Sequence, residues 1–113
     1  MGIATDMKWQ PATVEEVKEI VRRDLAECND EQIQTFESFS IDPFKAAIVR
    51  YEQTERVVVV ARRGDEVMYW DDVEEGFNIS PVTSDGQILQ HFCNQDSLGL
   101  ALNAWIKAKR DVL

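Results

Sequence analysis

The stretch YWDDVEEGF, Tyr69 to Phe77, holds the residues with the clearest chemical potential: Asp71, Asp72, Glu74 and Glu75, with no positive charge among them. Four close carboxylates could hold a hard cation or supply the acid and base of a glycosidase. The spacing favours neither use. A calcium loop needs a DxDxDG-like pattern, and adjacent aspartates on a strand point to opposite faces. A glycosidase pair needs a cleft that so small a domain can hardly form. We therefore expect no metal site, no cofactor and no carboxylate-based catalysis here.

Two interpretations of this stretch remain, a solvated hairpin rim and a docking surface for a basic protein. Carboxylates packed this closely repel one another, and Lys or Arg groups of a partner would relieve that repulsion. Aromatic residues beside them are of the types that anchor interfaces. The docking hypothesis assigns the charged contacts to the four acids and the anchor to Tyr69 or Phe77. Its partner-binding residues are therefore Tyr69, Asp71, Asp72, Glu74, Glu75 and Phe77.

A second pair with chemical potential is His91 with Cys93 in QHFCNQD. Positions 91 and 93 share one face of a strand, so a Cys–His nucleophile pair is geometrically conceivable. His91 is the single histidine of the chain, and no other residue marks a nucleophile or an oxyanion hole. We expect a protein that is not an enzyme, and keep a small enzyme using His91 and Cys93 as an alternative.

The negative charge of the chain is concentrated in one segment. The chain has 21 acids, 12 bases and a net charge of −9, and no Lys or Arg occurs from Gly64 to Ile106. The acids of that segment are Asp65, Glu66, Asp71, Asp72, Glu74, Glu75, Asp85 and Asp96. Proteins that bind nucleic acids neutralise phosphates with Lys and Arg, which this segment lacks. We expect no nucleic-acid binding.

Length and composition indicate one ordinary globular domain. The 113 residues are 44% hydrophobic and 29% charged, which is typical of a folded soluble protein. No apolar run approaches the ~20 residues of a membrane helix. The first residues resemble no signal peptide, and Cys28 and Cys93 stand apart without a CxxC motif. We expect a cytoplasmic protein with no membrane contact. Its single domain, 1–113, has a loose leader over 1–11 and a folded body over 12–113.

The elements that must position these residues begin with two helices. Thr13 and Glu16 form a capping-box pattern, followed by apolar residues at helical spacing, so we expect a first helix from about Val14 to Cys28. Asn29-Asp30 interrupts this pattern and can cap a short second helix, about 31–38.

The apolar period then changes from 3.6 to 2, which is typical of strands. Short connections between the strands indicate antiparallel neighbours. We expect an α+β fold, an antiparallel four- to five-stranded meander with N-terminal helices and a C-terminal helix packed mainly on one face. The expected strands are Ala46–Glu52, Arg56–Arg62, Glu66–Asp71, Phe77–Val82 and, as a fifth, Gln87–Phe92, with the last helix at about Ser97–Lys109.

Val57 to Val60 is apolar on both faces of its strand, whereas a sheet with a wet side alternates. We expect this strand to be central and covered on both sides. The second cover could be the second helix, a loop, or another protein chain. The last option gives a second functional hypothesis, a homo-oligomeric structural domain such as a homodimer.

In size, acidic charge and element order the chain resembles small bacterial immunity-type proteins, acidic α+β domains that block a cognate toxin. No residue motif carries this resemblance, so it assigns no site residues. It implies an inhibitor that binds a basic partner. The leading hypothesis is a non-enzymatic interaction module whose acidic 65–75 region engages a basic protein partner.

Overall fold

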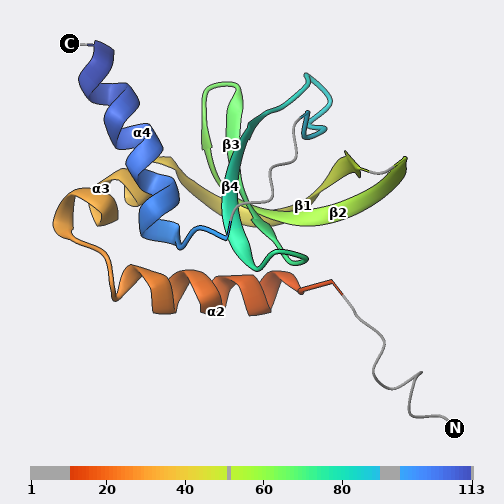
Figure 1. The fold of residues 1–113 in the computed structure, drawn as a ribbon, viewed down its shortest axis with the longest axis horizontal. Helices are drawn as coiled ribbons and strands as arrows, with labels where there is room; N and C mark the ends of the chain where they lie inside the picture. The colour runs from red at the N-terminus through yellow and green to blue at the C-terminus, as the bar shows by residue number, and fades with distance from the viewer. Residues whose placement is uncertain (1–10, 51, 90–94, 113) are drawn as a thin grey trace, which may run out of the picture.

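A computed structural model describes residues 11–50, 52–89 and 95–112 of the chain. The described elements, numbered as in Figure 1, are α2 (Val14–Leu25), α3 (Asp30–Phe39), β1 (Ser40–Arg50), β2 (Gln53–Arg63), β3 (Glu66–Asp71), β4 (Gly76–Pro81) and α4 (Leu98–Val112). The strands form one antiparallel sheet in the order β1-β2-β3-β4. The expected α+β meander is confirmed, with four strands rather than five.

Both N-terminal helices begin where the sequence places their caps. Thr13 and Glu16 form a complete capping box at α2, and Asn29 and Gln32 form another at α3. Helix α2 ends at Leu25, earlier than expected, because a tighter hydrogen-bonded turn follows it. The N–H of Cys28 donates to the carbonyl of Leu25 at 3.1 Å, a three-residue turn that stops the helix before the next cap.

Strand β1 begins six positions earlier than expected, at Ser40 instead of Ala46. It contains Pro43, which cannot donate a ladder hydrogen bond and is tolerated because β1 lies at the edge of the sheet. Its register with β2 shifts between Ser40 and Phe44. Asp42 and Pro43 therefore lie in the extended first part of the strand.

The sheet separates two hydrophobic cores, and β2 contributes to both, as its apolar run predicts. Val58 and Val60 face the helices, while Val57 and Val59 face the other side. The helix-side core comprises Val17, Val21, Val58, Val60, Ala61, Met68, Phe77, Leu98, Ala101, Leu102 and Trp105. The opposite core comprises Ala46, Ile48, Val57, Val59, Val67, Tyr69 and Ile88. The helices thus pack on one face, and β2 is central.

The second face is covered by the chain itself. Beyond β4 the chain returns so that the N–H of Ile88 donates to the carbonyl of Ala47 at 2.9 Å. Ile88 forms a parallel bridge to Ile48 of β1 and an antiparallel bridge to Val82. It therefore links the two edges of the curled sheet (Figure 1). Of the three expected covers, a loop of the same chain supplies this one, and a second copy is not needed to bury the face.

The expected fifth strand, Gln87–Phe92, is represented in the described residues by these bridges at Ile88. Positions 90–92 lie outside the described residues. In the described part of the chain, no helix has both the length and the apolarity to cross a bilayer.

Candidate functional site

The β3–β4 turn, residues 71–75, is called the acidic turn below. Asp71 is fully buried and holds the turn in shape. Its Oδ1 accepts hydrogen bonds from the N–H groups of Val73 at 3.0 Å and Glu74 at 3.3 Å. An aspartate that satisfies the backbone two residues ahead is a common turn device. This carboxylate therefore shapes the surface rather than lying on it.

The next acid, Asp72, is half-buried and fastens the turn to α2. Its Oδ2 accepts a hydrogen bond from the N–H of Ala12 at 2.9 Å, directly before the Thr13 cap. Two of the four predicted charged contacts thus have structural roles. Nothing in the sequence near Asp72 identifies Ala12, which lies 60 positions away, as its hydrogen-bond partner.

Tyr69 and Phe77, the expected anchors, are both 0% exposed. Tyr69 lies in the core opposite the helices, whereas Phe77 lies in the helix-side core. The Phe77 ring meets the ring of Trp70 edge-on, with centroids 5.1 Å apart. Neither buried ring presents a surface to a partner.

Glu74 and Glu75 remain on the surface. The Glu74 carboxylate accepts a long hydrogen bond, 3.5 Å, from Nε2 of Gln95. Glu75 is exposed and has a left-handed backbone, with φ of 56°. That conformation costs a non-glycine residue roughly 1–2 kcal/mol, and Gly64 and Gly86 occupy the comparable positive-φ positions. Between the acids, the apolar side chain of Val73 is 54% exposed.

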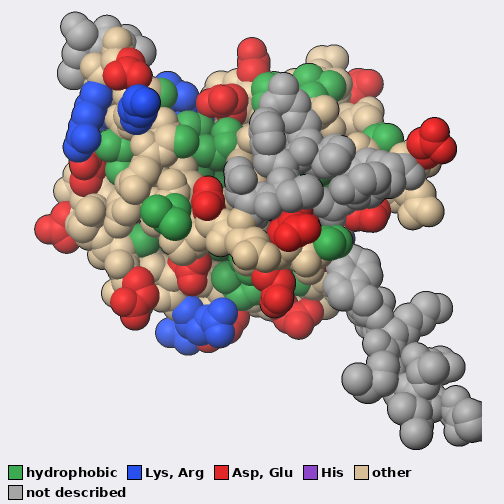
Figure 2. Space-filling view, in the orientation of Figure 1, with side chains coloured by type: hydrophobic (Ala, Val, Ile, Leu, Met, Phe, Trp, Pro, Cys, Tyr) green, Lys and Arg blue, Asp and Glu red, His purple; other side chains and the backbone are tan. Residues whose placement is uncertain are grey.

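A hollow of about 390 Å³ lies beside the acidic turn and is called the Trp70 hollow. Its lining residues are Ile20, Arg23, Asp24, Trp70, Glu75, Gln95, Asp96 and Ser97. Three acids and one arginine surround a half-buried indole, so the hollow favours a cation. Figure 2 shows acidic side chains gathered over the same region, where α2 and the acidic turn meet.

Sequence reasoning missed the roles of Trp70 and Val73, although both lie in the stretch that it singled out. Alternation along β3 places Trp70 on the face opposite Tyr69, so the three aromatics could never share one surface.

Two hydrogen bonds from backbone N–H groups fix the position of residues that line this hollow. The N–H of Phe77 donates to the carbonyl of Asp96 at 2.8 Å, and Oδ2 of Asp24 accepts from the N–H of Leu98 at 3.0 Å.

The second chemical candidate, His91 with Cys93, lies outside the described residues. The other cysteine, Cys28, is half-buried and donates its thiol hydrogen bond to the carbonyl of Asp24 at 3.3 Å. Burial raises the pKa of the Cys28 thiol, and the negative charges of Asp24 and Glu27 raise it further. A thiol held protonated is a poor nucleophile. Within the described residues, no group of three or more His, Cys, Asp or Glu side chains could hold a metal ion.

No protein-family model matches this chain, and no curated protein or solved structure matches it significantly.

Proposed function

We propose that this protein is a non-catalytic interaction module that binds a basic protein through the acidic turn and the Trp70 hollow. The hollow supports this proposal, because its lining places Asp24, Glu75 and Asp96 around a half-buried tryptophan, with Arg23 as the single opposing base. A Lys or Arg side chain can lay its aliphatic stem on an indole and direct its charge to carboxylates. The exposed Val73 adds an apolar side chain to the acidic turn.

Rigidity supports this use of the surface. The carboxylates of Asp71 and Asp72 fix the turn internally and to α2 before any partner arrives. A pre-ordered surface loses less conformational entropy on binding, so more of the contact energy contributes to affinity. Glu75 has a left-handed backbone conformation that glycine would adopt without strain. The presence of a carboxylate at this strained position is consistent with a role in binding.

The chemistry fits an inhibitor of a toxin or nuclease that imitates the negative charge of the enzyme's substrate. Opposite charges would speed association, and ionic strength would weaken it. We place the protein in the cytoplasm, where the free thiol of Cys28 would persist.

Affinity capture from a lysate of the source organism, at low and high salt, tests this proposal. The informative bait carries Glu74→Lys and Glu75→Lys, which leaves the structural Asp71 and Asp72 intact. The matched control carries Asp65→Lys and Asp85→Lys, two exposed acids away from the turn, so both baits have the same net charge. The proposal predicts a basic protein retained at low salt by wild type and control but lost from the turn variant. Equal behaviour of the two variants would contradict it.

A further inference from the structure

A second concave surface lies between α3 and α4 and is called the α3–α4 groove. It has a volume of about 690 Å³, within the size range of sites for small molecules. Its lining residues are Glu31, Gln34, Thr35, Ser38, Phe39, Arg63, Trp105, Ile106, Lys109 and Arg110. None of them lines the Trp70 hollow, so the groove does not depend on the proposed function.

The apolar part of the groove is a fixed aromatic pair. Phe39 meets Trp105 edge-on, with ring centroids 5.4 Å apart. The indole N–H of Trp105 donates to Oε1 of Glu66 at 3.1 Å, and Arg63 donates to the same oxygen at 3.2 Å. The polar edge of the tryptophan is therefore satisfied inside the protein. Trp105 and Ile106 are only 2% and 6% exposed, so they form the buried floor of the groove, and the half-buried Phe39 is its accessible ring.

The rim of the groove carries the opposite charge to the chain as a whole. Arg63, Lys109 and Arg110 line it against the single acid Glu31, in a chain whose net charge is −9. Figure 2 shows basic side chains gathered at the C-terminal end of α4. Lys109 is exposed and forms no ion pair within the described residues.

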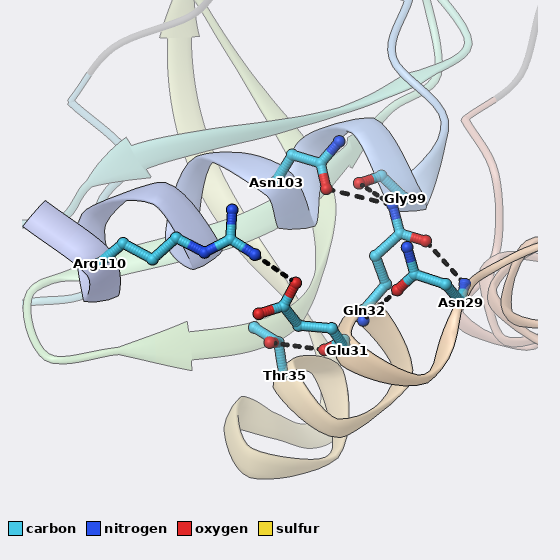
Figure 3. Close-up of polar contacts among 7 residues, drawn as sticks. All are labelled: Asn29, Glu31, Gln32, Thr35, Gly99, Asn103 and Arg110. Atoms are coloured by element: carbon cyan, nitrogen blue, oxygen red, sulfur yellow. Dashed lines mark hydrogen bonds and ion pairs between the residues drawn. The ribbon is translucent and has the colours of Figure 1, made fainter.

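Carboxylates already pair with two of these cations, Glu66 with Arg63 and Glu31 with Arg110. Arg110 Nη2 lies 2.7 Å from Oε1 of Glu31, and both side chains extend from facing helices (Figure 3). Both partners are more than half exposed, at 66% and 54%, and such surface pairs contribute little to stability. An incoming anion can therefore displace Glu31 or use Lys109 beside it.

We propose that the α3–α4 groove binds a small amphipathic anion, with its apolar body against Phe39, over the buried Trp105 and Ile106, and its charged group at Lys109 and Arg110. The nearby Glu31 carboxylate competes for Arg110 and so limits the affinity. The ligand is recognised by two features together, an apolar chain or ring and a single negative charge.

Backbone amide shifts in NMR spectra of the full chain, titrated with decanoate, decanol and decyltrimethylammonium, test this proposal. Decanoate is expected to shift amides of α3 and α4 around the groove, and to bind about fivefold or more tightly than the other two, since a unit charge near a cation at the surface contributes about 1 kcal/mol. Equal affinity for decanol, or shifts confined to another surface, would overturn the proposal. So would the absence of decanoate binding.

Two matched pairs of variants locate the charge recognition. Lys109→Glu should weaken decanoate binding about fivefold or more, while Lys107→Glu, an exposed position of α4 outside the groove, should change it much less. Glu31→Gln should strengthen binding severalfold by freeing Arg110, and Glu37→Gln, exposed on the same helix, should not. Equal effects within either pair would show that only net charge acts and would overturn the proposed site.

Discussion

The carboxylate of Asp72 accepts a hydrogen bond from the backbone N–H of Ala12 at 2.9 Å, although the two residues are 60 positions apart. This contact ties the β3–β4 turn to the start of α2. Asp72→Ala should lower the free energy of unfolding by about 1–2 kcal/mol, because a half-buried N–H loses a charged acceptor. Urea unfolding measures this loss. Asp85→Ala, at an exposed acid in another turn, is the control and should stay within about 0.5 kcal/mol of wild type. Equal losses would mean that the contact does not stabilise the fold.

Gln32 joins α3 to α4 through its side chain. Its Oε1 accepts from the N–H of Asn29, and its Nε2 donates to the carbonyl of Gly99 at 3.2 Å and to Oδ1 of Asn103 at 3.1 Å (Figure 3). Gln32→Glu keeps the capping acceptor but sets a carboxylate oxygen against two acceptors. We expect a loss of about 1–2 kcal/mol in unfolding free energy.

Thermal and urea unfolding of Gln32→Glu measure that loss. Gln34→Glu, an exposed position on the same helix, makes the same chemical change without these contacts and should be nearly neutral. If the two variants unfold alike, the bridge between the helices contributes nothing measurable.

Glu75 has a φ of 56°, and replacing it with glycine should change stability and partner binding in opposite directions. Glu75→Gly removes the strain of the left-handed backbone and should raise the unfolding free energy by up to about 1 kcal/mol. It also removes a carboxylate of the Trp70 hollow, so it should weaken binding of the basic partner. Glu75→Gln keeps the strain and should weaken binding without the gain in stability. A glycine variant that binds as well as wild type would show that this carboxylate makes no contact.

The raised pKa of Cys28 gives a dependence on pH with a defined sign. Burial lifts the pKa of this thiol above 9.0, its ordinary value, in the folded state. Folding then favours the protonated thiol, so its stabilising contribution is complete below pH 9.0 and is lost as pH rises through the higher folded pKa. Cys28→Ser lacks this loss, so the stability advantage of wild type over the variant should shrink between about pH 8 and 10. A constant difference across that range contradicts the prediction.

The reactivity of Cys28 follows from the same shift. In a Cys93→Ser background, Cys28 should react with a thiol reagent at neutral pH more slowly than the cysteine of a short unstructured peptide. Labelling at the rate of the peptide would show that the folded protein does not suppress the thiolate.

Local signals predicted much of the fold. Both caps, Thr13 and Asn29, rest on contacts within three residues, and β3 has the expected bounds, Glu66–Asp71. The double-faced run Val57–Val60 correctly predicted a central, covered strand because alternation depends only on the strand period. Boundaries that depend on distant packing were missed, such as the early start of β1 at Ser40.

The candidate site was predicted only in part for the same physical reason. Composition identified the acidic stretch, but the roles of its residues depend on neighbours far along the chain. Asp72 reaches Ala12, the core around Tyr69 is completed by Ile88, and Phe77 is buried beneath the helices. The same packing leaves Val73 exposed and Trp70 half-buried at the edge of the helix-side core.

The acidic turn and the Trp70 hollow together form the proposed binding surface for a basic protein. The most direct test is to purify the protein captured by the wild-type bait and titrate it, at two salt concentrations, against the Glu74→Lys/Glu75→Lys and Asp65→Lys/Asp85→Lys variants. If this surface binds the partner, the first variant should bind about tenfold or more weakly than the second at low salt, and this gap should narrow as salt screens the charges. Equal affinities for the two variants would rule out binding through the acidic turn.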